Sequence, residues 1–532
     1  MKIMVGENNN GLWFLFLIRV RISRLLALLA MAIALQSSAI GGQWFITPSL
    51  QLSEIYSDNI NLSPAGSEKG EFLTQVNPAI SILRTGGRTN LNLTYRLQNI
   101  INQGGSGGVN IHNQLFAIGT SELVRNRLFL NASSTIGQQN IVNTGRVTTG
   151  NINATGNRTD VYTFSLSPVW TPQFSGYANG AVRLGYNLVN TSAAVTGTSN
   201  TYSVNAQLQS GYKFSNIYWR MGYNDSYSDR SLGGNVRFRS YNGEIRYYFS
   251  RRYAVIFSAG NASNSFLSNT NTNQNGTYYL AGLAWTPSRK LRMEGGYGKN
   301  LQYVQVQVAP TLRTNMLVRF RHSDVGTNTG NVWNARITHL TGRTNWQASY
   351  SENTTTTQQL LLNQNPFNQA TSNITTGLSV TSNLGLPSLT PQVIVRKLAQ
   401  GSVSMVTGRS TLNLTLFHSR RKFQVSLTKD NSIGVIGSWN WRFSTRTNSR
   451  LQLSWNRNTT SGAPLTMLNQ NPNRRNNIYN ISLRLTRNIA DYLNVAKNIN
   501  GSVEYNFLKQ DSSDPMFSFN ENRVLAFLNI LF

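Results

Sequence analysis

The sequence predicts an all-β chain: a single large antiparallel transmembrane outer-membrane β-barrel of about 24 strands (22–26), preceded by a signal peptide. Segments of about ten residues alternate apolar and polar side chains, which is the period of a strand with two different faces. Tight turns alternate along the chain with long loops rich in Asn, Ser, Thr and Gly. The last segment, "RVLAFLNILF", is an apolar strand that ends on an aromatic residue.

The composition supports one continuous β unit. Of the 532 residues, 13% are charged and 39% hydrophobic, and β-branched and aromatic residues occur throughout. After the first forty residues no apolar run approaches the ~20 residues of a membrane-spanning helix. The chain has no cysteine, which excludes disulfides, thiolate catalysis and cysteine-ligated zinc.

The first 39 residues have the organisation of an export signal. Arg19, Arg21 and Arg24 precede an apolar core over 25–35, and Ser37 and Ala39 form a small-residue cleavage site. We therefore predict a signal peptide over 1–39 and the barrel over 40–532. The alternative is a retained anchor helix that includes the apolar residues 12–18.

The alternating segments predict which side chains face lipid. In "RTNLNLTYRLQN" one parity holds Leu91, Leu93, Tyr95 and Leu97, and the other holds Asn, Thr, Arg and Gln. "SRLQLSWNRN" and "NNIYNISLRLTRN" repeat the pattern. In "NVRFRSYNGEIRYYF" the apolar parity changes between Phe238 and Ile245, which predicts a bulge or a shifted register.

The connections predict two different rims. Short turns occur at 84–88, 124–127, 171–174, 249–252, 286–290, 341–343 and 407–410. The longer tracts between them are 101–109, 139–158, 190–200, 267–276, 355–392 and 458–476. Outer-membrane barrels combine short periplasmic turns with long outer loops. A soluble sandwich array would also alternate, but the signal peptide, this asymmetry and the aromatic end favour the barrel.

The final strand predicts closure of the barrel. Leu528, Ile530 and Phe532 share the apolar parity, and the strand is expected to pair with the first one, near "QWFITPSLQL". The opposite parity is also apolar, with Leu525, Phe527 and Leu531. A terminal Phe after such a strand resembles the signal that the barrel-assembly machinery reads, so that machinery is a predicted partner.

The formal net charge of +29 points to polyanionic partners. An arginine at the bilayer midplane on the lipid side costs about 2–4 kcal/mol, so arginines on the polar parity are expected in the lumen. The predicted lumen residues are Arg96, Arg183, Arg220, Arg237, Arg239, Arg246, Arg292, Arg319, Arg321, Arg336, Arg442 and Arg484. The expected partners are membrane lipid, lipopolysaccharide and an anionic polysaccharide, with no nucleic acid. The alternative for each arginine is a rim position beside lipopolysaccharide phosphates or water.

The width of the barrel raises the question of what fills it. About 24 strands give a diameter near ~45–50 Å, which wall side chains cannot fill. The tract 355–392 is the prime candidate for an inward constriction, with Leu360, Leu361, Leu362 and Phe367 among polar residues. The alternative is a disordered surface loop.

Catalytic chemistry has little support. His112, His322, His339 and His418 show no metal-ligand spacing, and "RHSDVG" on a strand sends neighbouring side chains to opposite faces. We expect no catalytic residues, cofactor or metal, with an outer-membrane hydrolase as the alternative.

The region that follows the leader resembles the outer-membrane barrel family found with PEP-CTERM/exosortase exopolysaccharide loci. The matching residues are Trp44, Pro48, Tyr56, Asp58, Asn59, Leu62, Val76, Pro78, Ile80, Arg88, Leu91, Leu93 and Tyr95. Ser57-Asp58-Asn59 stands where the family has "TDN", and Pro78-Ala79 where it has "PG". The resemblance covers about the first fifth of the chain and brings no catalytic residues.

The resemblance implies an envelope protein tied to exopolysaccharide production or export, with periplasmic export components as partners. Together with the polar, basic lumen it favours an exit pore for a polysaccharide or similar polymer. An anion-preferring diffusion porin and a plugged structural scaffold are the alternatives, and bilayer conductance separates an open porin from a gated exporter.

Overall fold

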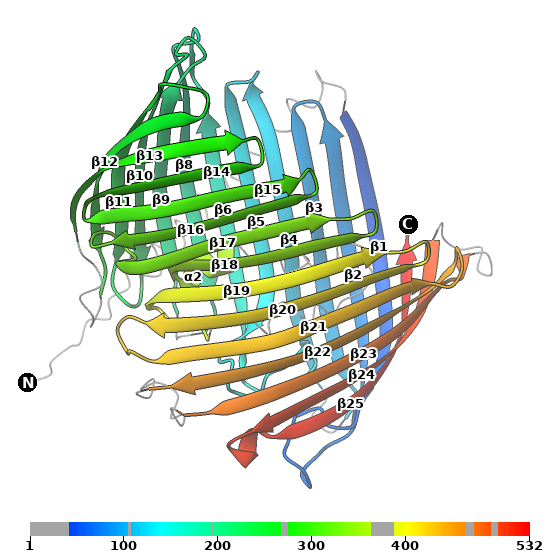
Figure 1. The fold of residues 1–532 in the computed structure, drawn as a ribbon. Coiled ribbons are helices and arrows are strands. Elements are labelled where there is room, and N and C mark those ends of the chain that lie inside the picture. Colours follow the sequence, from blue (N-terminus) through cyan, green and yellow to red (C-terminus); the bar gives the residue numbers. More distant parts are fainter. Residues whose placement is uncertain are drawn as a thin grey trace, which may run out of the picture.

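The computed structural model describes residues 42–104, 108–193, 196–267, 275–362, 388–462, 473–490 and 498–532. The predicted signal peptide and Phe367 lie outside these ranges. Within them, the structure is almost entirely antiparallel sheet (Figure 1). No helix in these ranges is both long and apolar enough to cross a membrane.

The first half of the wall contains β1 (Gly42–Ser57), β2 (Glu71–Gly86), β3 (Thr89–Asn102), β4 (Val109–Val124), β5 (Leu128–Asn140), β6 (Arg158–Trp170), β7 (Gln173–Phe174), β8 (Ala178–Thr191), β9 (Ser199–Ser210), β10 (Ile217–Arg230), β11 (Val236–Tyr248) and β12 (Tyr253–Ser265). The second half contains β13 (Gly276–Ser288), β14 (Leu291–Lys299), β15 (Leu301–Thr311), β16 (Thr314–Ser323), β17 (Gly330–Leu340), β18 (Thr344–Thr356), β19 (Val393–Val406), β20 (Ser410–Phe423), β21 (Lys429–Arg442), β22 (Thr447–Ser461), β23 (Arg475–Asn488), β24 (Asn498–Ser512) and β25 (Phe519–Leu531). The helix α2 (Thr357–Leu362) follows β18, and a 3-10 turn, η2 (Pro515–Phe517), precedes β25.

The sheet closes on itself through the first and last strands. β25 pairs with β1, from Ser49 opposite Leu531 to Ser57 opposite Arg523. The two-residue β7 continues the edge of β6 along β8, so the wall has 25 − 1 = 24 strands. Closure pairs the backbone of β1 with that of β25 over Ser49–Ser57, and a bilayer requires such pairing of strand edges. The predicted barrel class, strand number and seam are confirmed.

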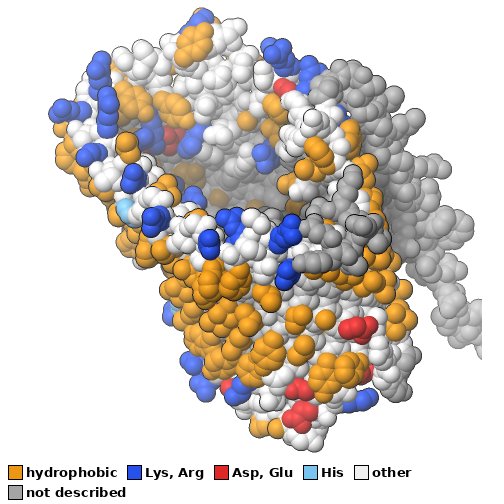
Figure 2. Space-filling model, turned by 90° about the vertical axis from the view of Figure 1, so that its right-hand side faces the viewer, with side chains coloured by type: hydrophobic (Ala, Val, Ile, Leu, Met, Phe, Trp, Pro, Cys, Tyr) orange, Lys and Arg blue, Asp and Glu red, His pale blue; other side chains and the backbone are white. Residues whose placement is uncertain are grey.

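The ladders assign each side chain to lipid or lumen. Leu91, Leu93 and Tyr95 on β3 share the face of exposed residues such as Leu52 on β1, whereas Thr94, Arg96 and Gln98 face inward. The same alternation continues around the wall, where Trp333 and Trp346 project outward and Asn334 and Gln347 project inward. On the face shown in Figure 2, hydrophobic side chains cover much of the outer wall.

The two rims differ as predicted. One rim carries tight connections such as 87–88, 125–127, 289–290, 312–313, 341–343 and 407–409. The opposite rim carries 58–70 and 141–157, and the described ends of two longer connections, 357–362 with 388–392 and 462 with 473–474. In outer-membrane barrels the short turns face the periplasm. We call these rims the short-turn rim and the long-loop rim.

The terminal Phe532 adds one contact to the seam. Its backbone N–H donates to the carbonyl of Pro48 at 3.0 Å, and its side chain is exposed on the lipid face. Because the ladder ends at Leu531, deleting Phe532 leaves the seam paired. We therefore expect the deletion to reduce barrel assembly in cells several-fold while refolding of purified chain into detergent stays unchanged.

Heat-modifiable gel mobility of membrane extracts and of refolded protein measures both quantities, with Phe532→Tyr as the conservative control. Equal loss in cells and in detergent would show that Phe532 acts on stability rather than on recognition.

Candidate functional site

The lumen wall carries most of the predicted arginines. The register places Arg96, Arg183, Arg220, Arg246, Arg292, Arg319, Arg321, Arg336, Arg442 and Arg484 on inward positions. Six of them gather on the inner face of β10 to β17: Arg220, Arg246, Arg292, Arg319, Arg321 and Arg336. We call these six residues the lumen arginine cluster.

Arg237 and Arg239 correct the prediction because they face outward. The β10–β11 ladder runs without a shift from Ile217 opposite Tyr247 to Ser228 opposite Val236, so the predicted bulge is also absent. Both arginines bind the outward Asp225, at 2.6 and 3.1 Å. Phe238 points inward, with its ring centroid 5.8 Å from that of Phe266. Because Phe238 is an aromatic residue on the inward face, the apolar parity of this segment did not identify the lipid-facing side chains.

Two buried carboxylates organise the lumen arginine cluster. Glu244 accepts from the guanidinium of Arg246 at 2.5 Å, and Glu294 accepts from another nitrogen of that guanidinium at 2.9 Å. Arg220 lies 3.6 Å from Glu244, and Arg292 lies 3.3 Å from Glu294. The side chain of Arg246 is mostly buried, whereas the exposed fractions of the Arg220 and Arg292 side chains are 37% and 42%. The carboxylates therefore hold one arginine in the wall and leave two beside it available to a ligand.

The neighbouring strands add cations, aromatic rings and amides. Arg319 on β16 lies over the ring of Tyr303 on β15, at 5.4 Å from the centroid. Gln305 and Asn334 flank Arg319 on the two adjoining strands. The six arginines of the lumen arginine cluster and the two carboxylates Glu244 and Glu294 together carry a net charge of 6 − 2 = +4. Such a surface can bind anionic groups through arginine and sugar hydroxyls through amides.

On the opposite lumen wall, several arginines are paired with carboxylates or amides. Arg484 on β23 makes an ion pair with Glu504 on β24, its Nε donating at 2.7 Å, and it stacks on Phe527. Arg523 binds Glu521 at 3.2 Å, and Arg96 donates to Gln114 at 2.8 Å. Further inward arginines that the sequence reading missed are Arg230, Arg396, Arg421, Arg450 and Arg523. These five arginines also lie on the polar parity of their strands, so the alternation that identified the other lumen arginines could have identified them too.

Most of the described connections of the short-turn rim carry Lys or Arg. Its connections carry Arg88, Arg125, Arg127, Lys213, Arg251, Arg252, Arg289, Lys290, Arg313, Arg343, Arg409 and Arg446. None of these described connections contains Asp or Glu. Figure 2 shows Lys and Arg side chains around the mouth at this end and a hollow beyond them. The positive potential of these turns is therefore concentrated at an open mouth.

The long-loop rim is covered from inside by residues 141–157, which we call the inner loop. The loop connects β5 and β6 and reaches β23 and β24, where Asn476 donates to the carbonyl of Thr144 at 2.9 Å and Gln510 to that of Gly145 at 2.9 Å. Asn153 donates to Glu521 at 2.9 Å, and Arg523 to the hydroxyl of Thr149 at 3.2 Å. Sequence reasoning assigned this tract only as a long loop, because its polar composition resembles that of a surface loop.

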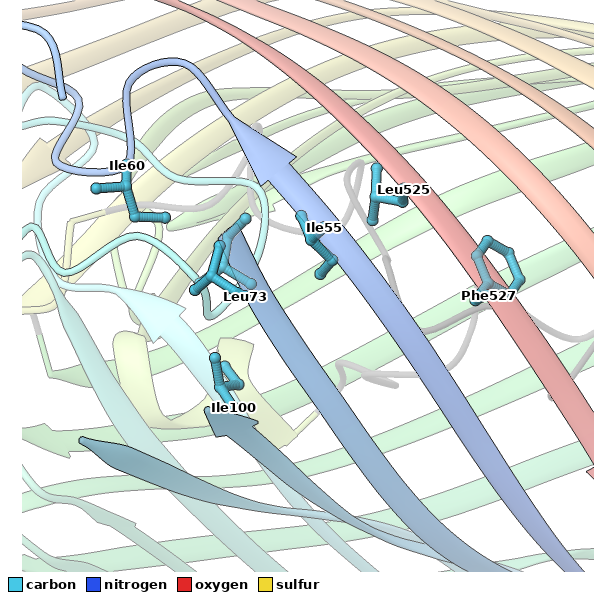
Figure 3. Close-up of a cluster of buried hydrophobic side chains, with 7 residues drawn as sticks. Ile55, Ile60, Leu73, Ile100, Leu525 and Phe527 are labelled. Carbon is cyan, nitrogen blue, oxygen red and sulfur yellow. The ribbon is translucent and has the colours of Figure 1, made fainter. Parts of the chain in front are cut away.

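Apolar anchors accompany these hydrogen bonds. Ile152 of the inner loop is buried with Ile55, Ile60, Leu73, Ile100, Leu525 and Phe527 (Figure 3). Val147 is buried in a second cluster with Leu62, Ile478, Leu508 and Phe519. Burying a large apolar side chain contributes roughly 1.5–3 kcal/mol. These contacts explain why β25 is apolar on both parities: one face meets lipid, and the other meets the lining of the inner loop.

The predicted constriction tract also folds inward where the structure describes it. Leu361 of α2 is buried with Leu389 against the inward residues Val161 and Val189, and Leu362 packs beside them. Leu360 lies in the same helix, partly buried. The Leu389 N–H donates to the carbonyl of Ile141 at 2.8 Å, and the Ser388 hydroxyl donates to Asn143 at 2.9 Å. The two inward segments are therefore joined to each other.

The position of α2 shows that the walls approach each other at this end. β18 and β8 are 18 − 8 = 10 positions apart in a wall of 24, close to the maximum of 12. A six-residue helix is only about 9 Å long, far less than the ~45–50 Å of a circular barrel. The long-loop end is therefore narrowed as well as covered.

The histidines do not assemble a site. Among the described residues, no group of three or more His, Asp, Glu or Cys side chains could hold a metal ion. His322 lies 3.2 Å from Asp324, whereas the Ser323 hydroxyl donates to the carbonyl of Val325 at 2.7 Å. The trio His322, Ser323 and Asp324 therefore does not converge on a shared hydrogen-bond chain.

A closed antiparallel wall, apolar outside and polar inside, with short turns on one rim and long loops on the other, defines an outer-membrane β-barrel. The chain resides in the bacterial outer membrane. No protein-family model and no curated protein matches the sequence.

Several solved structures resemble the fold of this chain. The FrpB iron transporter of Neisseria meningitidis is 10% identical, with 91% of this chain and 82% of that chain covered and a TM-score of 0.43. The siderophore receptor PirA of Acinetobacter baumannii is 10% identical over 92% and 80% of the two chains, with a TM-score of 0.43. OpdK of Pseudomonas aeruginosa, solved with vanillate, is 8% identical over 92% and 99%, with a TM-score of 0.32.

Proposed function

We propose that this barrel is an exit conduit for an anionic polysaccharide or similar polymer, entered from the periplasm and gated at the cell surface. The single observation that carries the proposal is the excess of Lys and Arg over acidic residues in the described connections of the short-turn rim, around an open mouth. A mouth of one charge sign raises the local concentration of anions and directs them inward.

The lumen supplies the next interactions along this path. Arg220, Arg292 and Arg319 present guanidinium groups, and their neighbours present amide and phenol groups. Guanidinium groups pair with carboxylate or phosphate, while amides hydrogen-bond to hydroxyls. A charged sugar chain offers both kinds of group in every repeat, which favours it over a small neutral solute.

The covered long-loop rim supplies the gate. The inner loop is attached through hydrogen bonds to neutral groups and to charged groups such as Glu521 and Arg523, and through the buried side chains Val147 and Ile152. Each of these contacts by itself contributes modestly. An always-open diffusion porin does not require such a cover. The resemblance to barrels of PEP-CTERM/exosortase exopolysaccharide loci supports a polymer of that class, supplied by periplasmic export components.

Deleting the gene in its host tests the proposal. We expect surface polymer to be lost while polymer accumulates in the periplasm, because synthesis continues and the exit is missing. Chemical quantification of uronic acid or phosphate in surface and periplasmic fractions measures both pools. Complementation with the intact gene is the control, and normal surface polymer in the deletion strain would contradict the proposal.

A further inference from the structure

The outer face of β19 to β24 carries a row of cations near the long-loop rim. The row comprises Lys397, Arg420, Lys422, Lys429, Arg457, Arg475 and Lys509, and we call it the outer basic row. All seven occupy outward positions, on the same parity as lipid-facing residues of their strands. Six of the seven are exposed, and Lys422 is partly buried. The outer basic row lies on the outside of the barrel, so an inference about it does not depend on the function proposed for the lumen.

On β20, β22 and β24 the outward residues change from apolar to basic towards the long-loop rim. On β20 the outward residues Leu412, Leu414 and Leu416 are followed by His418, Arg420 and Lys422. On β22, Leu451, Leu453 and Trp455 are followed by Arg457, and on β24, Tyr505 and Phe507 are followed by Lys509. An outward cation costs about 2–4 kcal/mol at the midplane and about 0–1 kcal/mol near the interface. The row therefore marks the upper border of the apolar belt, at the level of lipid headgroups.

Several of these cations stand directly opposite one another. Lys397 pairs across the ladder with Arg420, and Lys422 pairs with Lys429. Like charges in directly opposed positions destabilise a sheet. Two such pairs on adjacent ladders therefore favour an anion that bridges them.

Acidic partners lie only at the two ends of the row. Lys397 binds Glu352 at 3.0 Å, and Lys509 binds Asp511 at 3.2 Å. Arg457 donates to Asn477 at 2.8 Å, and Arg420 donates to His418 at 3.3 Å, both neutral partners in this arrangement. The described outward positions of β20 to β23 contain no Asp or Glu. The centre of the row thus has five cations and no carboxylate on that face.

We propose that the outer basic row binds the phosphate groups of lipopolysaccharide in the outer leaflet. The required ligand has two or more phosphates on a headgroup that also carries acyl chains, because the cations border the apolar belt formed by residues such as Leu416, Ile433 and Trp455. A free phosphate or a soluble polymer would match the charge and leave the adjoining apolar surface without a partner. The multiple phosphates of lipid A match several cations at once.

The test compares two triple variants of the full barrel purified in detergent. R420Q/K422Q/K429Q removes the centre of the row, and R251Q/R343Q/R409Q removes the same charge from exposed positions in the short-turn rim. Binding of deep-rough lipopolysaccharide to each protein is measured by native mass spectrometry and by co-elution. We expect about a tenfold loss of affinity for the row variant and little change for the rim variant.

Two further measurements identify the chemistry of the ligand, and a third checks that each variant is folded. Lipid A stripped of its phosphates should bind the wild type as weakly as intact lipopolysaccharide binds the row variant, and millimolar inorganic phosphate should not displace the intact lipid. Heat-modifiable mobility shows that each variant is folded. Equal binding by the row variant and wild type, equal binding of dephosphorylated lipid, or displacement by free phosphate would each overturn the proposal.

Discussion

Replacing residues 143–153 of the inner loop by a short Gly-Ser connector should open the barrel. These residues carry the anchors to Asn476, Gln510 and Glu521 and the two buried side chains Val147 and Ile152. Without them the part of the lumen below the long-loop rim loses its cover. We expect single-channel conductance in planar bilayers to rise by about an order of magnitude over the wild type.

A cross-linked variant provides the opposite perturbation. The Asn143 N–H donates to the Ser388 hydroxyl at 3.2 Å, so the two Cα atoms are near enough for a disulfide. The chain has no native cysteine, and N143C/S388C therefore creates a single bridge. The oxidised variant should remain closed when polymer or voltage is applied, and reduction should restore wild-type behaviour. An unchanged conductance in the Gly-Ser variant, with its barrel folded, would show that the inner loop is not the barrier.

Removing two lumen arginines should weaken anion preference by at least about threefold. Arg319 and Arg321 lie two residues apart on the inner face of β16, so R319Q/R321Q removes two charges from the lumen arginine cluster. The loss reduces the positive potential along the path of a permeating anion. The measurement is the reversal potential across a salt gradient, made in the Gly-Ser background so that current flows.

The chain itself offers a matched control for this pair. Arg237 and Arg239 have the same spacing on β11 but face outward, where they bind Asp225. R237Q/R239Q should therefore leave the anion-to-cation permeability ratio unchanged. If both pairs alter selectivity equally, the change reflects total charge rather than lumen position, and the assignment of the conducting surface is wrong.

The predictions that held were those that depend on period and on the lengths of connections. In a strand with lipid on one side and water on the other, apolar and polar side chains must alternate with period two. This alternation is visible in single segments such as 89–98. The unequal rims and the pairing of the last strand with the first follow from the same local information together with the requirement for closure.

The predictions that failed needed either the pairing register of neighbouring strands or contacts with distant segments. The inward Phe238 made Arg237 and Arg239 look like lumen residues, and only the unbroken β10–β11 ladder shows which face each occupies. The apolar Leu525 and Phe527 gave no indication of their partner, because Ile152 lies more than 370 residues earlier in the chain (525 − 152 = 373). For the same reason, the inner loop could not be distinguished from a surface loop by its composition.

The sequence by itself determined the barrel, its membrane, its seam and its abundance of arginine, because alternation and charge are properties of neighbouring residues. The tertiary structure alone decided which loops cover the lumen, how the two walls approach each other, and where cations meet lipid. Those features arise from contacts between strands and loops distant in the chain, and the free energy of such contacts depends on three-dimensional proximity that no local pattern encodes.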